Sequence, residues 1–238
     1  MNTQVILVPG FWLGARAWDE VMPGLRERGL AATALTLPGR RPGEADSDLA
    51  ARTSPQDQAE SIHTALDREA DRRVLVVHSG AAIPGTLVID QHPELVDHVV
   101  WVDTAPSSPE GAMNAEFTGD WLHLEDAWDE EVEQGSMRDL TEEQLTAFRE
   151  QVVPEPGAVV RTPVHLGDER RLSVPGTVVC TSFTADQYRE YAGQGVPFLA
   201  ALTDHTALEY VDLPTGHWPM WSRPEELAEI IAEAATGR

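Results

Sequence analysis

The sequence of 238 residues contains no lysine, because all 17 of its basic residues are arginine. The absence of lysine excludes Schiff-base catalysis and the phosphate-binding loops that depend on a lysine. A single cysteine, Cys180, excludes an internal disulfide and any metal site that needs several cysteines. Because Cys180 ends the apolar run 178–180, we expect it to be a buried small residue and not a reactive thiol.

Long hydrophobic runs are also absent, and no stretch approaches the ~20 apolar residues that a membrane-spanning helix needs. The N-terminus carries no basic segment, and the apolar run 5–8 is too short for a secretion signal. The 40 acidic residues outnumber the basic ones and give a formal net charge of -23. Such a surface repels phosphate backbones and anionic lipids. We therefore expect a cytoplasmic protein that binds a small molecule and neither nucleic acid nor a membrane.

Short apolar runs rich in Val and Ile alternate with amphipathic patterns along most of the chain. The expected strands are residues 5–8, 32–37, 74–77, 99–102, 177–180 and 208–211. The expected helices are residues 17–28, 56–69, 83–91 and 225–235. This alternation predicts an α/β protein with a doubly wound, mostly parallel sheet.

The alternation breaks between residues 105 and 174, where no strand is predicted. Two acidic helical patterns, at 116–134 and 141–152, predict a helical cap insertion there. The core then comprises residues 1–104 and 175–238. The insertion also carries aromatic side chains, among them Trp121 and Trp128. Each alone usually serves packing, but as a group they are candidates for the lining of an apolar substrate pocket. The predicted pocket residues are these two together with Trp12 and Trp218 of the core.

The strongest local signal is Val77-His78-Ser79-Gly80-Ala81, which joins an apolar strand to an apolar helix. A serine in such a tight turn is held in a strained conformation, with its hydroxyl exposed at the carboxyl end of the sheet. Gly80 and Ala81 let the helix pack closely, although Val77 is bulky where close approach is expected. We interpret Ser79 as the candidate nucleophile and expect His78 to orient the turn. The alternative is a serine that ends the strand and caps the helix.

Two further segments favour the nucleophile interpretation. After the first strand, a turn at Pro9-Gly10-Phe11-Trp12 leaves the Phe11 amide free to bind an oxyanion, with the Gly80 amide as second donor. Near the C-terminus, His217 lies in a loop between the last strand and the last helix. A loop histidine between a glycine and a Trp-Pro pair is poorly explained by core packing, and it is suited to accept the serine proton.

This ordered set of motifs resembles the α/β-hydrolase superfamily. The resemblance covers nearly the whole chain, with the insertion in the position of that family's cap. It implies that Ser79 is the nucleophile, that His217 is the base, and that the Phe11 and Gly80 amides bind the oxyanion. The same fold hosts many different reactions, so the resemblance implies the fold more strongly than the chemistry.

Two carboxylates are candidates for the acid that orients the histidine. The usual place in the family is the loop after strand 177–180, where the late Asp186 looks like the N-cap of a helix. The other known place is the end of the preceding strand, where Asp103 follows residues 99–102 beside the nucleophile strand. We favour Asp103 over Asp186. The alternative role for Asp103 is a helix cap or a turn at the entry to the insertion.

The leading hypothesis is a serine hydrolase that cleaves a small apolar or aromatic ester or lactone through an acyl-enzyme. The chain has no G-x-G-x-x-G, H-x-x-x-H or H-x-H pattern, so neither a cofactor nor a metal is predicted. One alternative is a cofactor-independent dioxygenase or a lyase of the same fold, in which the serine and histidine deprotonate the substrate. The other alternative is a catalytically inactive, hydrolase-like binding protein.

Overall fold

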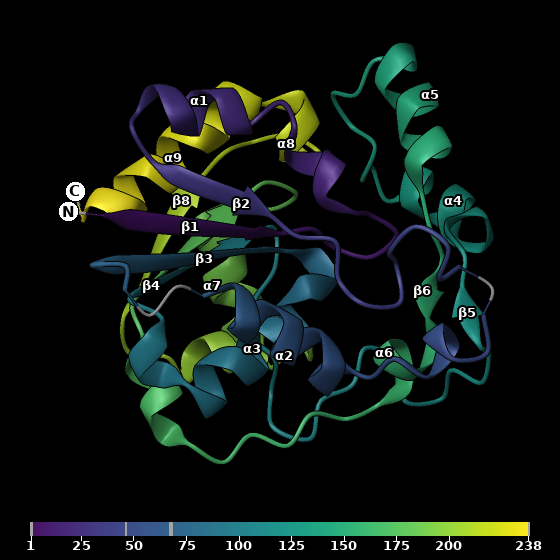
Figure 1. Cartoon of the computed structure of the whole chain (residues 1–238), viewed down its shortest axis with the longest axis horizontal. Helices are drawn as coiled ribbons and strands as arrows, with labels where there is room; N and C mark the ends of the chain where they lie inside the picture. Colours follow the sequence, from purple (N-terminus) through teal and green to yellow (C-terminus); the bar gives the residue numbers. More distant parts are fainter. Residues whose placement is uncertain (1, 46, 67–68, 238) are drawn as a thin grey trace.

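In the part of the chain that the structure describes, the fold is built on one sheet of six parallel strands in the order β2-β1-β3-β4-β7-β8 (Figure 1). The computed structural model describes residues 2–45, 47–66 and 69–237. The strands are β1 (Thr3–Val8), β2 (Ala31–Ala34), β3 (Arg72–His78), β4 (His98–Val102), β7 (Gly176–Cys180) and β8 (Leu208–Asp212). The predicted α/β class with a doubly wound sheet is therefore confirmed.

Burial on both faces explains why the central strands read as continuous apolar runs. Val74 to Val77 of β3 are all completely buried, between β1 on one side and β4 on the other. At the edge of the sheet, β2 pairs with β1 alone among the described strands and ends at Ala34, so it is shorter than the predicted strand 32–37.

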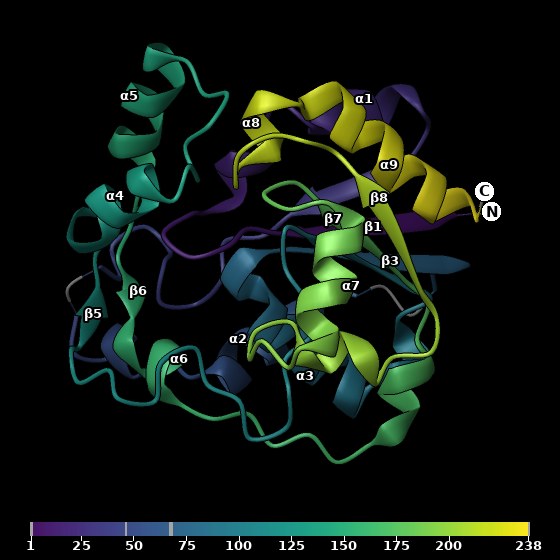
Figure 2. The same ribbon diagram turned by 180° about the vertical axis from the view of Figure 1, so that it is seen from behind.

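Helices cover both faces of the sheet, as Figures 1 and 2 show. On one face, α1 (Met22–Glu27) packs against α9 (Pro224–Thr236), which contacts β3 and β4. On the other face lie α2 (Pro55–Ala65), α3 (Ala82–Gln91) and α7 (Ala185–Gly193). The apolar helix α3 directly follows the turn that carries Ser79 and is buried over nearly its whole length.

Three predicted helices differ from the observed ones. The pattern 116–134 is helical only over its second part, residues 124–133, and residues 121–122 within it form a strand. The pattern 17–28 forms a short 3-10 helix, η1 (Ala15–Trp18), and then α1. Pro23 lacks an N–H, so it is suited to the first turn of a new helix and not to the middle of one long helix. The pattern 56–69 forms α2, which ends at Ala65, and residues 67–68 lie outside the described residues.

Most of the segment between β4 and β7, from β5 to α6, lies beyond the carboxyl ends of the strands, and its last part returns past α3 toward the other end of the sheet (Figure 1). Its elements are β5 (Trp121–Leu122), α4 (Leu124–Glu133), α5 (Glu142–Gln151), β6 (Glu155–Pro156), α6 (Gly157–Arg161) and the 3-10 helix η5 (Glu169–Ser173). The expectation of no strand between residues 105 and 174 is wrong, because β5 and β6 form an antiparallel pair. Strands of two residues have no readable period, so this pairing depends on tertiary contacts. Within the described ranges, no helix is both long and apolar enough to cross a membrane.

Candidate active site

Three residues with strained backbone surround the carboxyl ends of the central strands. Ser79 follows β3 with φ of 52°, Asp103 follows β4 with φ of 47°, and Trp12 in the loop after β1 has φ of 65°. Non-glycine residues adopt such left-handed conformations rarely and at a cost. In the described part of the chain only Glu110 and Asp139 share this property. Strain is therefore concentrated where the sequence predicts the site.

Glycines make the close packing of the Ser79 turn possible. A Cβ atom on Gly80 would collide with the ring of Phe11, and one on Gly10 would lie 2.7 Å from the Cβ of Ser79. A Cβ on Gly85 of α3 would lie 2.8 Å from Cγ1 of Val77. Gly85 thus supplies the space that the bulky Val77 needs, and this explains how the turn tolerates a valine there.

A continuous chain of hydrogen bonds joins three of the predicted site residues. Ser79 Oγ lies 2.8 Å from His217 Nε2, and His217 Nδ1 lies 2.6 Å from Asp103 Oδ2. The three side chains come from the loops after β3, β8 and β4. An ionised Asp103 accepts the proton of Nδ1, which leaves Nε2 free to accept the proton of the Ser79 hydroxyl.

Asp186, the rival carboxylate, is not part of this chain. Its side chain is 97% exposed and pairs with Arg189 at 3.1 Å. It is also not the N-cap of α7, which corrects the interpretation from the sequence. The cap is Thr184, whose hydroxyl accepts a hydrogen bond from the Gln187 amide, and Asp186 lies in the first turn.

Four donors besides His217 hold the carboxylate of Asp103. Oδ1 accepts from the amides of Thr181 and Ser182, at 3.2 and 3.0 Å, and from the hydroxyl of Tyr188 at 2.9 Å. Oδ2 accepts from the hydroxyl of Ser182 at 2.6 Å. Burial acts to raise the pKa of Asp103, but the bond and charge of His217 and the two Ser182 bonds outweigh it and lower that pKa. Asp103 therefore stays ionised.

Sequence motifs did not predict Ser182 and Tyr188 as partners of this carboxylate. Ser182 lies in the loop after β7, where the family usually has its acid, and the absence of a carboxylate near the start of that loop was the available signal. Tyr188 lies on α7 and is 2% exposed. No local pattern links it to Asp103, because the two residues are far apart in the sequence.

The loop of His217 packs against the segment that follows α4. The His217 amide donates to the carbonyl of Ser136 at 2.8 Å. A Cβ on Gly216 would collide with the carbonyl oxygen of Arg138, so this position requires a glycine. Burial lowers the pKa of His217, but the bond and charge of Asp103, with a contribution from Glu131, raise it above the ordinary histidine value.

His78 connects the loop after β1 to the histidine loop. Its Nδ1 accepts from the Gly10 amide at 3.3 Å, so its Nε2 carries the proton and donates to the carbonyl of His217 at 2.7 Å. Burial and the neighbouring His217 lower the pKa of His78 to about 3. A neutral His78 therefore holds two parts of the site in fixed relation.

The two amides predicted to bind an oxyanion lie beside Ser79. Within the described chain, the Phe11 amide donates to no other group. Gly80 is the second residue of the 3-10 helix η3 (Ser79–Ala81), at a position where a helical N–H has no partner inside the helix. Both N–H groups are thus free to donate to the same substrate oxygen.

The four tryptophans predicted to line a pocket occupy different environments. Trp12 Nε1 donates to the carbonyl of Leu122 at 3.0 Å, and Trp121 belongs to β5. The guanidinium of Arg149 lies 3.9 Å from the ring centre of Trp128. Trp218 is 1% exposed and packs on Phe148. Three of the four therefore have packing partners, and their contact with substrate stays a prediction.

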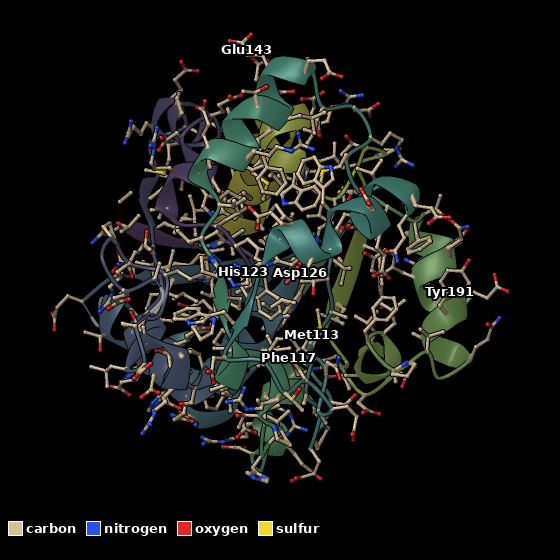
Figure 3. All side chains as sticks on the ribbon, turned by 90° about the vertical axis from the view of Figure 1, so that its right-hand side faces the viewer. Met113, Phe117, His123, Asp126, Glu143 and Tyr191 are labelled. Carbon is tan, nitrogen blue, oxygen red and sulfur yellow. The ribbon has the colours of Figure 1, made fainter. Side chains whose placement is uncertain are left out.

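The face formed by α4 and the chain before it is shown in Figure 3. Met113 and Phe117 lie below His123 and Asp126 in that view, and Met113 is 55% exposed.

No cluster of three or more His, Cys, Asp or Glu side chains in the described ranges is arranged to hold a metal ion. Cys180 is buried, as expected, and burial raises the pKa of its thiol to about 12.

A model of the alpha/beta hydrolase family matches residues 5–230. The chain therefore belongs to the alpha/beta hydrolase family, and the resemblance predicted from the motifs is confirmed. A search of curated protein sequences finds no match to this chain.

Solved structures share the fold at low sequence identity. A pyrethroid hydrolase from Sphingobium faniae JZ-2 is 20% identical with a TM-score of 0.66, over 98% of this chain and 97% of its own. An extracellular alpha/beta-hydrolase from a Paenibacillus species is 17% identical with a TM-score of 0.71, over 98% and 99%. A methylesterase from Arabidopsis is 14% identical with a TM-score of 0.70, over 100% of each chain.

Proposed function

We propose that the protein hydrolyses small carboxylic esters or lactones through a covalent acyl-enzyme. The observation that carries the proposal is the hydrogen-bonded chain from Ser79 Oγ through His217 to Asp103. This arrangement activates a serine that would otherwise be a weak nucleophile. The names of two structural neighbours, a pyrethroid hydrolase and a methylesterase, support hydrolysis and an ester substrate, respectively.

In the first half of the reaction, Ser79 Oγ attacks the ester carbonyl while His217 Nε2 takes the hydroxyl proton. The carbonyl oxygen becomes an oxyanion, which the Phe11 and Gly80 amides stabilise. The intermediate then collapses, the bond to the alcohol breaks, and His217 returns its proton to the departing oxygen. An acyl group remains on Ser79.

In the second half, water attacks the acyl carbon and His217 takes one of its protons. The bond between the acyl carbon and Ser79 Oγ breaks, the carboxylic acid leaves, and the proton returns to the serine. Asp103 holds the imidazole in the required tautomer and stabilises its positive charge in both halves. The aromatic residues between β4 and β7 favour an apolar or aromatic acyl or alcohol group.

Labelling with a fluorophosphonate, followed by intact mass measurement, tests the proposal directly. We expect one adduct per chain on the wild type and none on Ser79→Ala. A panel of p-nitrophenyl esters, lactones and aromatic heterocycles, with oxygen uptake recorded, tests the substrate class. Oxygen uptake without ester turnover would favour a cofactor-independent dioxygenase, and the absence of both adduct and turnover would favour a binding protein.

A further inference from the structure

The loop that carries the Phe11 amide rests on a buried ion pair. Arg40 Nη1 lies 3.3 Å from Glu155 Oε2, and the two side chains are 1% and 0% exposed. Arg40 follows β2, whereas Glu155 begins β6 in the segment between β4 and β7. Charges buried this deeply lose much hydration energy, which their attraction offsets only when further polar groups surround them. Most of those polar groups belong to the loop after β1.

Arg40 binds the carbonyl end of the peptide unit whose other end is the Phe11 amide. Its Nη1 donates to the carbonyl of Gly10, and its Nη2 lies 3.4 Å from the carbonyl of Pro9. In a trans peptide the C=O and the N–H point in opposite directions. Anchoring the Gly10 carbonyl on Arg40 therefore aims the Phe11 N–H away from the guanidinium.

The positive charge of Arg40 also changes the strength of this donor. A hydrogen bond from a cation to a peptide carbonyl polarises the peptide and makes its N–H a better donor, because linked hydrogen bonds strengthen one another in a buried setting. The chain just before this peptide group is restrained as well, because the Gly10 amide donates to Nδ1 of His78 at 3.3 Å.

Glu155 fixes the chain on the other side of Phe11. Oε1 of its carboxylate accepts a hydrogen bond from Gln58 Nε2 at 3.1 Å. Burial raises the pKa of Glu155, and the charge of Arg40, this bond and the Trp12 amide act against that rise. The carbonyl of Trp12 accepts from the Val153 amide at 2.9 Å. The strained φ of Trp12 persists only where its surroundings over-determine it, and these bonds supply that restraint.

We infer that Arg40 and Glu155 are positioning residues for the oxyanion donor: their ion pair aims and polarises the Phe11 amide. Glu155 thereby makes β6 contribute to catalysis without touching the substrate. The inference rests on the proposed function, since it concerns an amide that acts only if an oxyanion forms.

A second buried ion pair in the chain provides a matched control. Arg171 Nη1 lies 3.4 Å from Asp90 Oδ1, and both side chains are 8% exposed. Asp90 lies in α3 and also accepts from the amides of Gly167 and Asp168, which precede η5. This pair joins α3 to the chain before β7 and contains no residue of the loop after β1. Its loss reports the effect of breaking a buried ion pair as such.

The inference is tested by comparing two variants, Arg40→Met and Arg171→Met. For each variant, kcat and KM are measured on one p-nitrophenyl ester. The melting temperature and the affinity for a boronic acid that mimics the tetrahedral intermediate are measured as well. We expect Arg40→Met to lower kcat ~100-fold or more, the scale of losing an oxyanion donor, with little change in KM. Boronic acid binding should weaken in parallel. Arg171→Met should lose thermal stability but keep its kcat. Equal kcat losses in the two variants would overturn the inference.

Two milder substitutions decide the matter if Arg40→Met does not fold. Arg40→Lys keeps the charge beside Glu155 but loses the planar fork that reaches two carbonyls, so kcat should fall about tenfold. Glu155→Gln keeps the shape that Gln58 and Trp12 require but removes the charge that holds Arg40, and it should also lower kcat at constant KM. Wild-type kcat in both variants would overturn the inference.

The fluorophosphonate result separates this inference from the proposed function. If the wild type is labelled at Ser79 and hydrolyses esters while the Arg40 variants behave like Arg171→Met, only the inference about the ion pair fails. If the wild type neither takes the label nor hydrolyses esters, the proposed function fails and the inference fails with it.

Discussion

The two sides of the candidate site are built in different ways. The nucleophile side, with the loops after β1 and β3, depends on tight packing around Gly10, Gly80 and Gly85. The base side, with the loops after β4, β7 and β8, depends on hydrogen bonds that converge on Asp103 from Ser182, Tyr188 and His217.

This difference has a physical origin. A strained turn needs small neighbours in van der Waals contact, and neighbours close in sequence supply most of them. A buried carboxylate needs several donors to remain charged, and donors can come from any element that reaches it. The turn around Ser79 is therefore encoded mainly by its neighbours in the sequence, whereas the base side is assembled from distant parts of the chain.

The largest expected loss of ester turnover comes from substituting one residue on each side of the site. Ser79→Ala and His217→Ala should each lower ester turnover on the order of 10⁵–10⁶-fold, and the double variant should be scarcely worse, because the residues act as a unit. Steady-state kinetics on the three variants provides the measurement. Losses that add, or an active Ser79→Ala enzyme, would contradict the acyl-enzyme mechanism.

The second-largest expected loss of turnover comes from a substitution on the base side alone. Asp103→Asn should reduce turnover ~10⁴-fold with the fold intact, because an amide favours the wrong tautomer of His217. Asp186→Asn is the matched control and should leave turnover unchanged, since its side chain is exposed and pairs with Arg189. Kinetics and thermal melts are measured side by side. If Asp186→Asn lost turnover while Asp103→Asn kept it, the acid would lie after β7 and not after β4.

The pH profile measures how strongly Asp103 acts on His217. Below its pKa the imidazole is protonated and cannot accept the serine proton, so kcat/KM should fall about tenfold per pH unit there. Because the pKa of His217 is raised, the step should lie above the ordinary value of ~6.5. His78, with a pKa of about 3, does not titrate in this range. A profile that is flat across this step would remove His217 as the base.

The smallest expected effect concerns the donors around the carboxylate. Tyr188→Phe removes one bond to Asp103 at nearly constant volume, which leaves more of the carboxylate's charge to stabilise a protonated His217. The kcat/KM step should move to higher pH, and the plateau should fall less than tenfold. Tyr191→Phe, on the same helix, is the control (Figure 3). Identical pH profiles in the two variants would assign Tyr188 a packing role only.

Much of the fold was predictable because its signals are local. Apolar runs predict the strands of the sheet, although the edge strand β2 ends early and the pattern 17–28 is split at Pro23. The two-residue strands β5 and β6 were not predictable, since their pairing depends on contacts between Trp121 and Pro156. Periodicity over several residues carries information that a two-residue strand lacks.

The sequence by itself determined the strand-turn-helix around Ser79, the loop position of His217 and the absence of lysine chemistry. In each case the residue types within a short segment carry the signal. Only the tertiary structure decided between Asp103 and Asp186, and only it brought Arg40 of the core against Glu155 of β6. A charge is stable in the interior only where donors and counter-charges converge on it, and that convergence is a property of three-dimensional packing.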